Sequence, residues 1–164
     1  MADLTHLNDR GEAHMVGVGH KPIVARTAVA QALVRVQPAT AAAILEGAVP
    51  KGDVGAVARL GGIAASKRTP ELIMLCHPLP IDGVKLEIAI DPGGLVTLTG
   101  HVQTTARTGV EMEALTAVAI AALNVYDMVK GIDAGPVIES IRLLSKYTAP
   151  AAGDAPGDNE PGRS

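Results

Sequence analysis

The chain has 164 residues, of which 48% are hydrophobic, and a formal net charge of −3 at pH 7, which fits one well-packed core. Its 14 lysines and arginines form no basic run, and its only aromatic residues are two tyrosines, which argues against a general nucleic-acid binder. A single cysteine, Cys76, permits neither an internal disulfide nor a cysteine-cluster zinc site. The polar N-terminus lacks the apolar core of a signal peptide, and the longest apolar stretch, 114–126, falls short of the roughly 20 residues of a membrane span. We therefore expect a cytoplasmic protein with no nucleic-acid or membrane partner.

The N-terminal half predicts an arm, one strand and three helices. Residues 1–22 show no periodicity and predict a loop or arm. Alternation over 23–36 favours a strand, although the alanines in it would also suit a helix. Proline at a first helical position predicts a short helix over 38–46, a polar turn is followed by a second helix over 53–68, and a third, short helix begins at 69.

The second of these helices carries two local signals. Asp53 stands where its side chain can cap the helix N-terminus. Gly61 and Gly62 lie inside the helix, where each destabilises it by about 1 kcal/mol relative to alanine. Glycines in such a position predict a kink or the close approach of another backbone.

The C-terminal half predicts three strands and a helix. Clean alternation over 84–90 and 96–102 around a Pro-Gly-Gly turn predicts a β-hairpin, and 137–147 predicts a last strand. The tail, 149–164, is rich in Pro, Gly and acidic residues and predicts disorder. The order is that of an α+β, ferredoxin-like βαββαβ fold with an antiparallel sheet and an extra helix after the first strand, in a single domain over 23–148.

The longest helix signal covers Thr108 to Lys130. Thr108 followed by Glu111 has the form of a capping box, and Gly131 marks the end. The middle of the segment has almost no polar face, and a helix that is apolar all round must be buried on nearly every side. One sheet covers one side of such a helix, so we expect a homo-oligomer in which a second subunit covers the other.

The charges of this helix sit only at its ends. Glu113 and Asp127 are fourteen residues apart, which corresponds to about 21 Å along a helix. They cannot serve one small-molecule centre within one chain unless the segment starts out non-helical. Either the chain has two functions, or one site is assembled from different subunits. The structural alternative is that Glu111 caps the helix and that Asp127 and Lys130 form a surface pair.

Several catalytic signatures are missing from the sequence, namely GxGxxG opening a helix, GxxxxGK[ST], HExxH and GxSxG. The candidate functional residues are instead polar groups at the ends of the predicted elements: Lys51, Lys67, Arg68, Cys76, His77, Glu111, Glu113, Asp127, Lys130 and Lys146. Lysines beside carboxylates can bind phosphates or exchange protons. Taken singly, each of these residues also has a structural interpretation at a helix end, in a loop or on a strand.

Five segments in register resemble one family. They are LTHLNDRGEAHMV (4–16), KGDV (51–54), AASKRTPELIMLCHPLP (64–80), TGVEMEALTAVAIAALNVYDMVK (108–130) and IRLLSK (141–146). Together they resemble the cyclic pyranopterin monophosphate synthase family, the MoaC family of molybdenum-cofactor biosynthesis, over roughly residues 4–147. The sequence departs from the usual family pattern at Gly17 and Gly19, where an Asp and a Ser are common.

The resemblance implies an activity, an assembly and a set of site residues. The family's enzymes convert 3′,8-cyclo-7,8-dihydro-GTP into the cyclic pyranopterin and release diphosphate. They form homohexamers, trimers of dimers, with sites at subunit interfaces. The roles implied here are an acid–base pair of Asp127 and Lys130, phosphate-binding cations at Lys51 and Lys146, with Lys51 counted among the catalytic groups, and substrate contacts from Leu75, Cys76, His77, Glu111, Met112 and Glu113.

The implied ligands and partners are few. No protein metal site is visible, although Mg²⁺ can arrive with the triphosphate. The upstream radical-SAM GTP cyclase is a candidate partner. Two competing interpretations are a non-catalytic ferredoxin-like metabolite-binding module and an assembly protein whose apolar helix only builds an oligomer.

Overall fold

The computed structural model describes residues 10–150. Its elements in chain order are β1 (Val24–Arg35), α1 (Pro38–Leu45), α2 (Val54–Ser66), α3 (Thr69–Leu72), β2 (Gly83–Ile90), β3 (Leu95–Ala106), α4 (Glu111–Val129) and β4 (Val137–Thr148). The strands and helices expected from the sequence are confirmed, with shifts of a few residues at their ends. The first nine residues of the predicted arm and residues 151–164 of the predicted disordered tail lie outside the described residues.

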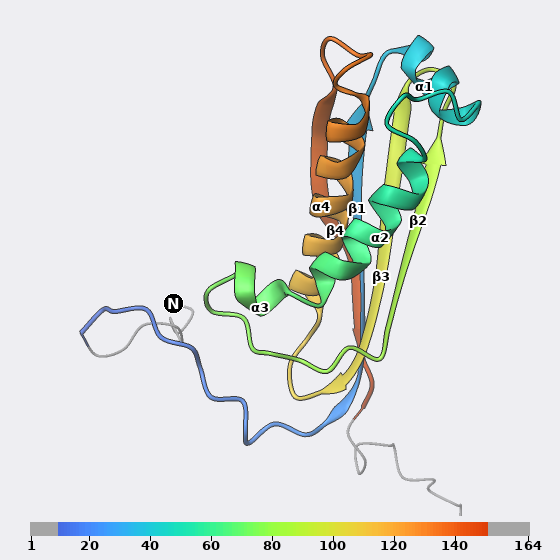
Figure 1. The fold of residues 1–164 in the computed structure, drawn as a ribbon. Helices are drawn as coiled ribbons and strands as arrows, with labels where there is room; N and C mark the ends of the chain where they lie inside the picture. Colours follow the sequence, from blue (N-terminus) through green and yellow to red (C-terminus); the bar gives the residue numbers. More distant parts are fainter. Residues whose placement is uncertain (1–9, 151–164) are drawn as a thin grey trace, which may run out of the picture.

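The four strands form one antiparallel sheet in the order β2-β3-β1-β4. β3 lies between the two strands that α1–α3 connect, and β1 lies between the two strands that α4 connects (Figure 1). The chain therefore folds as two interlocked β-α-β units, which is the expected ferredoxin-like arrangement.

Helices α2 and α4 cover one face of the sheet, and the core lies between them and the strands (Figure 1). A Cβ atom on Gly62 would lie 2.7 Å from the backbone oxygen of Ala117 in α4. Glycine is therefore needed where α2 crosses α4, and the predicted close approach of a second backbone is confirmed. The predicted cap is confirmed as well, because the Asp53 carboxylate accepts the N–H of Ala56.

Helix α4 begins later than the sequence predicts. Its N-cap is Val110, without a side-chain capping bond, so the predicted capping box of Thr108 and Glu111 is wrong. The reason is a competing partner: the Glu111 carboxylate is paired with the Lys146 ammonium of β4 instead.

The same helix is not covered on every side by its own chain. Within one chain Leu123 is 54% exposed and Tyr126 is 39% exposed. Helix α4 has 19 residues and, by length and composition alone, is long and apolar enough to cross a membrane. This differs from the expectation from the sequence, which rests only on the apolar stretch 114–126. However, 56% of its apolar stretch is buried against the rest of the protein, as in a core helix.

Strand β4 follows β1 with two irregularities that skip Glu139 and Leu144. As a result Lys146 pairs with Ala28, whose side chain is buried beneath the helices. Directly paired residues lie on the same face of a sheet, so Lys146 rises on the helix face. This placement allows it to reach Glu111.

Candidate functional site

A cavity of about 380 Å³ lies at the N-terminal end of α4. Three segments line it: the end of the arm, the loop between α3 and β2, and the start of α4. The lining residues are Val16, Val18, Lys21, Leu75, Cys76, His77, Leu79, Thr108, Gly109, Glu111, Met112 and Glu113. Six residues predicted to contact substrate therefore line one cavity, although the sequence places them in two segments.

Two carboxylates of this cavity have opposite electrostatic environments. Burial acts to raise the pKa of Glu111, but the Lys146 ammonium at 2.9 Å and the backbone N–H of Glu111 hold that pKa below its usual value. Glu113 is 2% exposed, and burial, with a smaller effect of the Glu111 charge, raises its pKa. Separated pKa values are typical of acid–base pairs in active sites.

His77 fixes the arm across the cavity. Its Nε2 lies 2.8 Å from the backbone oxygen of Val16, and a carbonyl can only accept, so Nε2 carries the proton. In the neutral ring, Nδ1 is then left as an acceptor. Arg107 also donates to the backbone oxygen of Lys21, which holds the second half of the arm.

The remaining predicted contacts differ in polarity. Leu75 is 40% exposed and Met112 is 36% exposed, so both are available to a ligand. Cys76 is half-buried, and burial, with a smaller effect of Glu113, raises the pKa of its thiol. A thiol in that state is a poor nucleophile, which favours a role in contact rather than in covalent chemistry.

Asp127, Lys51 and Lys130 form a second cluster at the opposite end of α4. The Lys51 ammonium donates to the backbone oxygen of Asp127 at 2.6 Å and to its Oδ2 at 2.9 Å. The Lys130 ammonium lies 2.8 Å from Oδ1. The two ammonium groups, Lys130 first, lower the pKa of Asp127 to about 2, and Asp127 in turn raises the pKa of Lys130.

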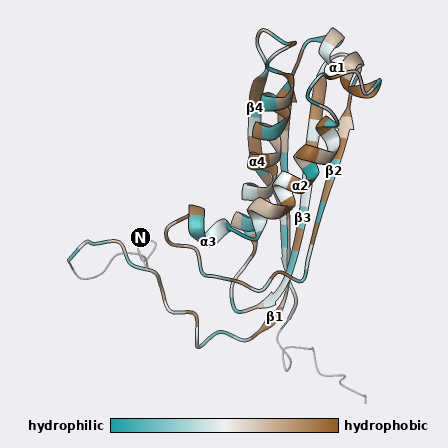
Figure 2. Ribbon diagram, in the orientation of Figure 1, coloured by the Kyte–Doolittle hydropathy of each residue, from teal (hydrophilic) through white to brown (hydrophobic). Residues whose placement is uncertain are grey.

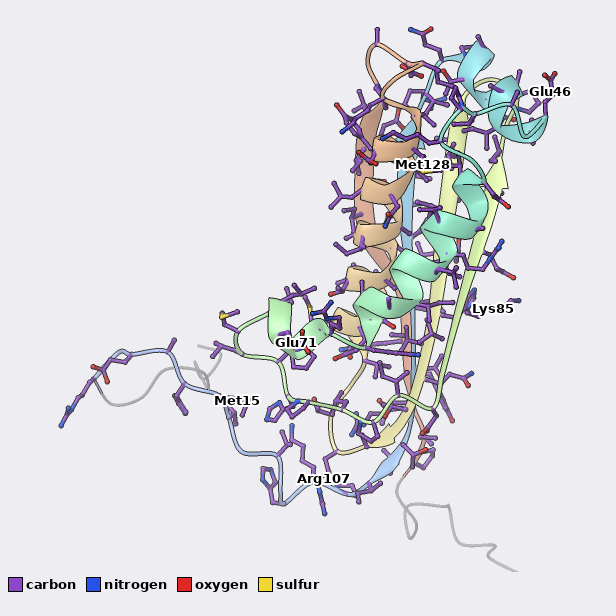
Figure 3. The ribbon with its side chains drawn as sticks, in the orientation of Figure 1. Met15, Glu46, Glu71, Lys85, Arg107 and Met128 are labelled. Atoms are coloured by element: carbon purple, nitrogen blue, oxygen red, sulfur yellow. The ribbon has the colours of Figure 1, made fainter. Side chains whose placement is uncertain are left out.

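The two groups of residues are separate within one chain. Glu113 and Asp127 both lie inside α4, so the helical rise places them about 21 Å apart. In Figure 3, Met15 of the arm and Arg107 lie at the lower end of the molecule, and Met128, the residue after Asp127, lies in the upper part of α4. Figure 2 shows hydrophilic turns in that upper part of α4 as well. We call these groups the cavity half and the lysine half of the candidate site.

The sequence patterns predict no contact with substrate for the arm residues or for the loop before α4. Val16, Val18, Lys21, Thr108 and Gly109 all line the cavity. A Cβ atom on Gly109 would collide with the Glu111 carboxylate, so only glycine allows that side chain to fold back. Among the described residues, no group of three or more His, Cys, Asp or Glu side chains could hold a metal ion.

Comparisons with known proteins agree on one family. The model of the MoaC family matches residues 15–148. The cyclic pyranopterin monophosphate synthase of Herpetosiphon aurantiacus is 53% identical over 152 residues, which covers 92% of each chain. The proteins of the same name from Thermomicrobium roseum (52% identity, 89% of each chain) and Cereibacter sphaeroides (53% identity, 89% of this chain and 92% of that one) are similarly close.

The residues matched by the family model include both halves of the candidate site. With relatives at this identity along nearly their full length, the chain belongs to the MoaC family.

Proposed function

We propose that this protein is a cyclic pyranopterin monophosphate synthase of molybdenum cofactor biosynthesis. In this reaction 3′,8-cyclo-7,8-dihydro-GTP rearranges, a hydroxyl of the substrate attacks the innermost phosphorus, and diphosphate leaves. The observation that carries the proposal is the shared name of relatives that are 52–53% identical over about nine-tenths of the chain.

The chemistry of the two halves supports this reaction. A leaving diphosphate needs cations that neutralise its growing charge, and Lys51 and Lys130 in the lysine half and Lys21 and Lys146 beside the cavity are suitable. The N–H groups of a guanine-derived ring suit the carboxylate acceptors of the cavity half.

The proton transfers of the rearrangement are assigned to the lysine half. Asp127, whose pKa is about 2, is ionised at neutral pH and can accept a proton, and Lys130 can donate one. Lys51 holds the Asp127 carboxylate from the other side. In the cavity half, Glu113 is the carboxyl group that most readily keeps a proton, because burial raises its pKa.

One complete site requires both halves, and we propose that neighbouring subunits of a homohexamer, a trimer of dimers, supply them. The separation of about 21 Å within one chain supports this arrangement, because it exceeds the reach of a single reacting centre. Exposed apolar residues beside each half also support it: Leu123 and Tyr126 near the lysine half, and Met74 and Leu75 near the cavity half.

Three further features belong to this proposal. Mg²⁺ accompanies the triphosphate rather than occupying a site made by the protein alone. The protein acts in the cytoplasm, and the substrate comes from the radical-SAM GTP cyclase of the preceding step. The domain comprises residues 23–148, and the arm residues Val16, Val18 and Lys21, which precede it, close one side of the cavity half.

The test is to supply the purified protein with 3′,8-cyclo-7,8-dihydro-GTP and to measure diphosphate and pyranopterin together. We expect both products in equal amounts, and we expect Asp127→Asn to bind the nucleotide while losing turnover. Tight binding by the unmodified protein without diphosphate release would contradict the proposal and indicate a metabolite-binding module.

A further inference from the structure

A buried carboxylate lies next to the lysine half and has no part in the chemistry described above. Asp133 follows α4 and is 3% exposed. Its Oδ2 accepts the N–H of Gln37 at 2.8 Å, and its Oδ1 accepts the N–H of Gly135 at 3.0 Å. The Thr40 side chain is a third partner. A buried carboxylate so fully bonded to neutral donors fixes the segments that supply them.

The bonds of Asp133 connect the two segments that form the lysine half. Asp127 and Lys130 come from the last turn of α4, three to six residues before Asp133. Lys51 comes from the turn after α1, and Gln37 is the N-cap of α1. Asp133 therefore fastens the start of α1 to the end of α4, while Lys51 contacts α4 from the segment that follows α1.

This connection closes a ring of links. It runs from Asp127 along the chain to Asp133, across a hydrogen bond to Gln37, through α1 to Lys51, and back to Asp127 across the 2.9 Å ion pair. On its far side, α2 packs against α4, which limits the movement of the turn from that direction. At the start of α1, the hydrogen bond from the Gln37 N–H to Asp133 adds a polar link to the end of α4.

We infer that Asp133 is a positioning residue: by tying α1 to the end of α4 it sets where the Lys51 ammonium meets Asp127. The inference rests on the proposed function for its catalytic consequence. Its structural consequence can be measured independently of any reaction, because the ionisation of Asp127 reports how closely the two lysines approach.

The test uses Asp133→Asn in the full-length protein. Asparagine keeps the shape and one oxygen acceptor, but it turns an N–H₂ group toward donors that need an acceptor. We expect kcat to fall by a factor on the order of ten to a hundred with a smaller change in KM, as for a misplaced catalytic group. We also expect the pKa of Asp127, followed by ¹³C NMR of labelled aspartate, to rise from about 2 toward its ordinary value.

Asp91→Asn is the matched control. Asp91 makes the same local contact, accepting the N–H of Gly93 at 2.7 Å, but in the β2–β3 hairpin. Both readouts should stay unchanged in this variant. If Asp133→Asn does not fold, Thr40→Val removes only one of the three bonds and should raise the pKa of Asp127 in the same direction by less.

Two results separate the possible failures. If the folded Asp133→Asn protein is less stable but keeps both kcat and the pKa of Asp127, the positioning role is wrong and Asp133 only stabilises the fold. If the unmodified protein does not turn the nucleotide over, the proposed function fails, while the titration of Asp127 still decides whether Asp133 positions the lysine half.

Discussion

Mixing two inactive variants tests whether neighbouring chains share a site. Asp127→Asn disables the lysine half and Glu113→Gln the cavity half, and the two positions lie about 21 Å apart along α4. Each homogeneous variant should release little diphosphate. If every site takes one half from each of two chains, randomly mixed assemblies should regain about a quarter of the unmodified activity, because each half is drawn independently in a symmetric oligomer.

The assay is diphosphate release after the two variants are unfolded together and refolded at equal concentration. Native mass spectrometry of differently tagged chains confirms that they have mixed. The matched control combines Asp127→Asn with Lys130→Ala, which lie in the same half and 2.8 Å apart in one chain, so that no site can be repaired. Mixed assemblies of the first pair that remain as inactive as the control pair would refute the shared site.

Three further predictions concern packing, ionisation and register. Gly62→Ala should lower the free energy of unfolding by about 1–2 kcal/mol in chemical denaturation, because crowding against Ala117 exceeds the gain in helix propensity. The control Gly131→Ala has open space around the added methyl group and should not lower the free energy of unfolding. Glu113 has a raised pKa, so its ionisation destabilises the fold as the pH rises through that pKa. Compared with the unmodified protein, Glu113→Gln should therefore be more stable at about pH 7 and should lose that advantage near pH 4. An equal difference in stability at both pH values would contradict the raised pKa. Exchanging Ser145 and Lys146 keeps the composition but moves the lysine to the position that pairs with Val29, on the face of the sheet without helices. Diphosphate release should then fall by a factor on the order of 10², because the cation no longer reaches Glu111. Retained activity would exclude a role for the Lys146–Glu111 pair.

Local patterns in the sequence predict most of the fold because they act over a few residues. The Asp53 cap, the hairpin turn and the glycine at the α2–α4 crossing each require only their neighbours or one packed helix. The start of α4 is predicted three residues early because the Glu111 side chain bonds to a strand 35 residues further along the chain. No local pattern carries that contact.

The same distinction applies to the candidate site. The sequence separates Glu113 from Asp127 correctly, since the helical rise alone sets that distance. It cannot bring Lys51 to Asp127 across 76 residues, nor the arm at Val16 to His77 across 61, because these contacts depend on how the helices and loops pack. The two skipped residues move the partner of Lys146 along β1 from Arg26 to Ala28 without changing its face of the sheet, and no local pattern predicts them, because they arise from pairing with β1.

The double pairing of Asp127 has a consequence for affinity. Lys51 and Lys130 are long, flexible side chains, and each normally loses rotamer freedom when it binds an anion. Here the carboxylate between them already holds both ammonium groups before any nucleotide arrives. In the proposed reaction, a phosphate group that binds here would meet a preorganised pair of cations, and the ordering entropy would be lost during folding rather than during binding.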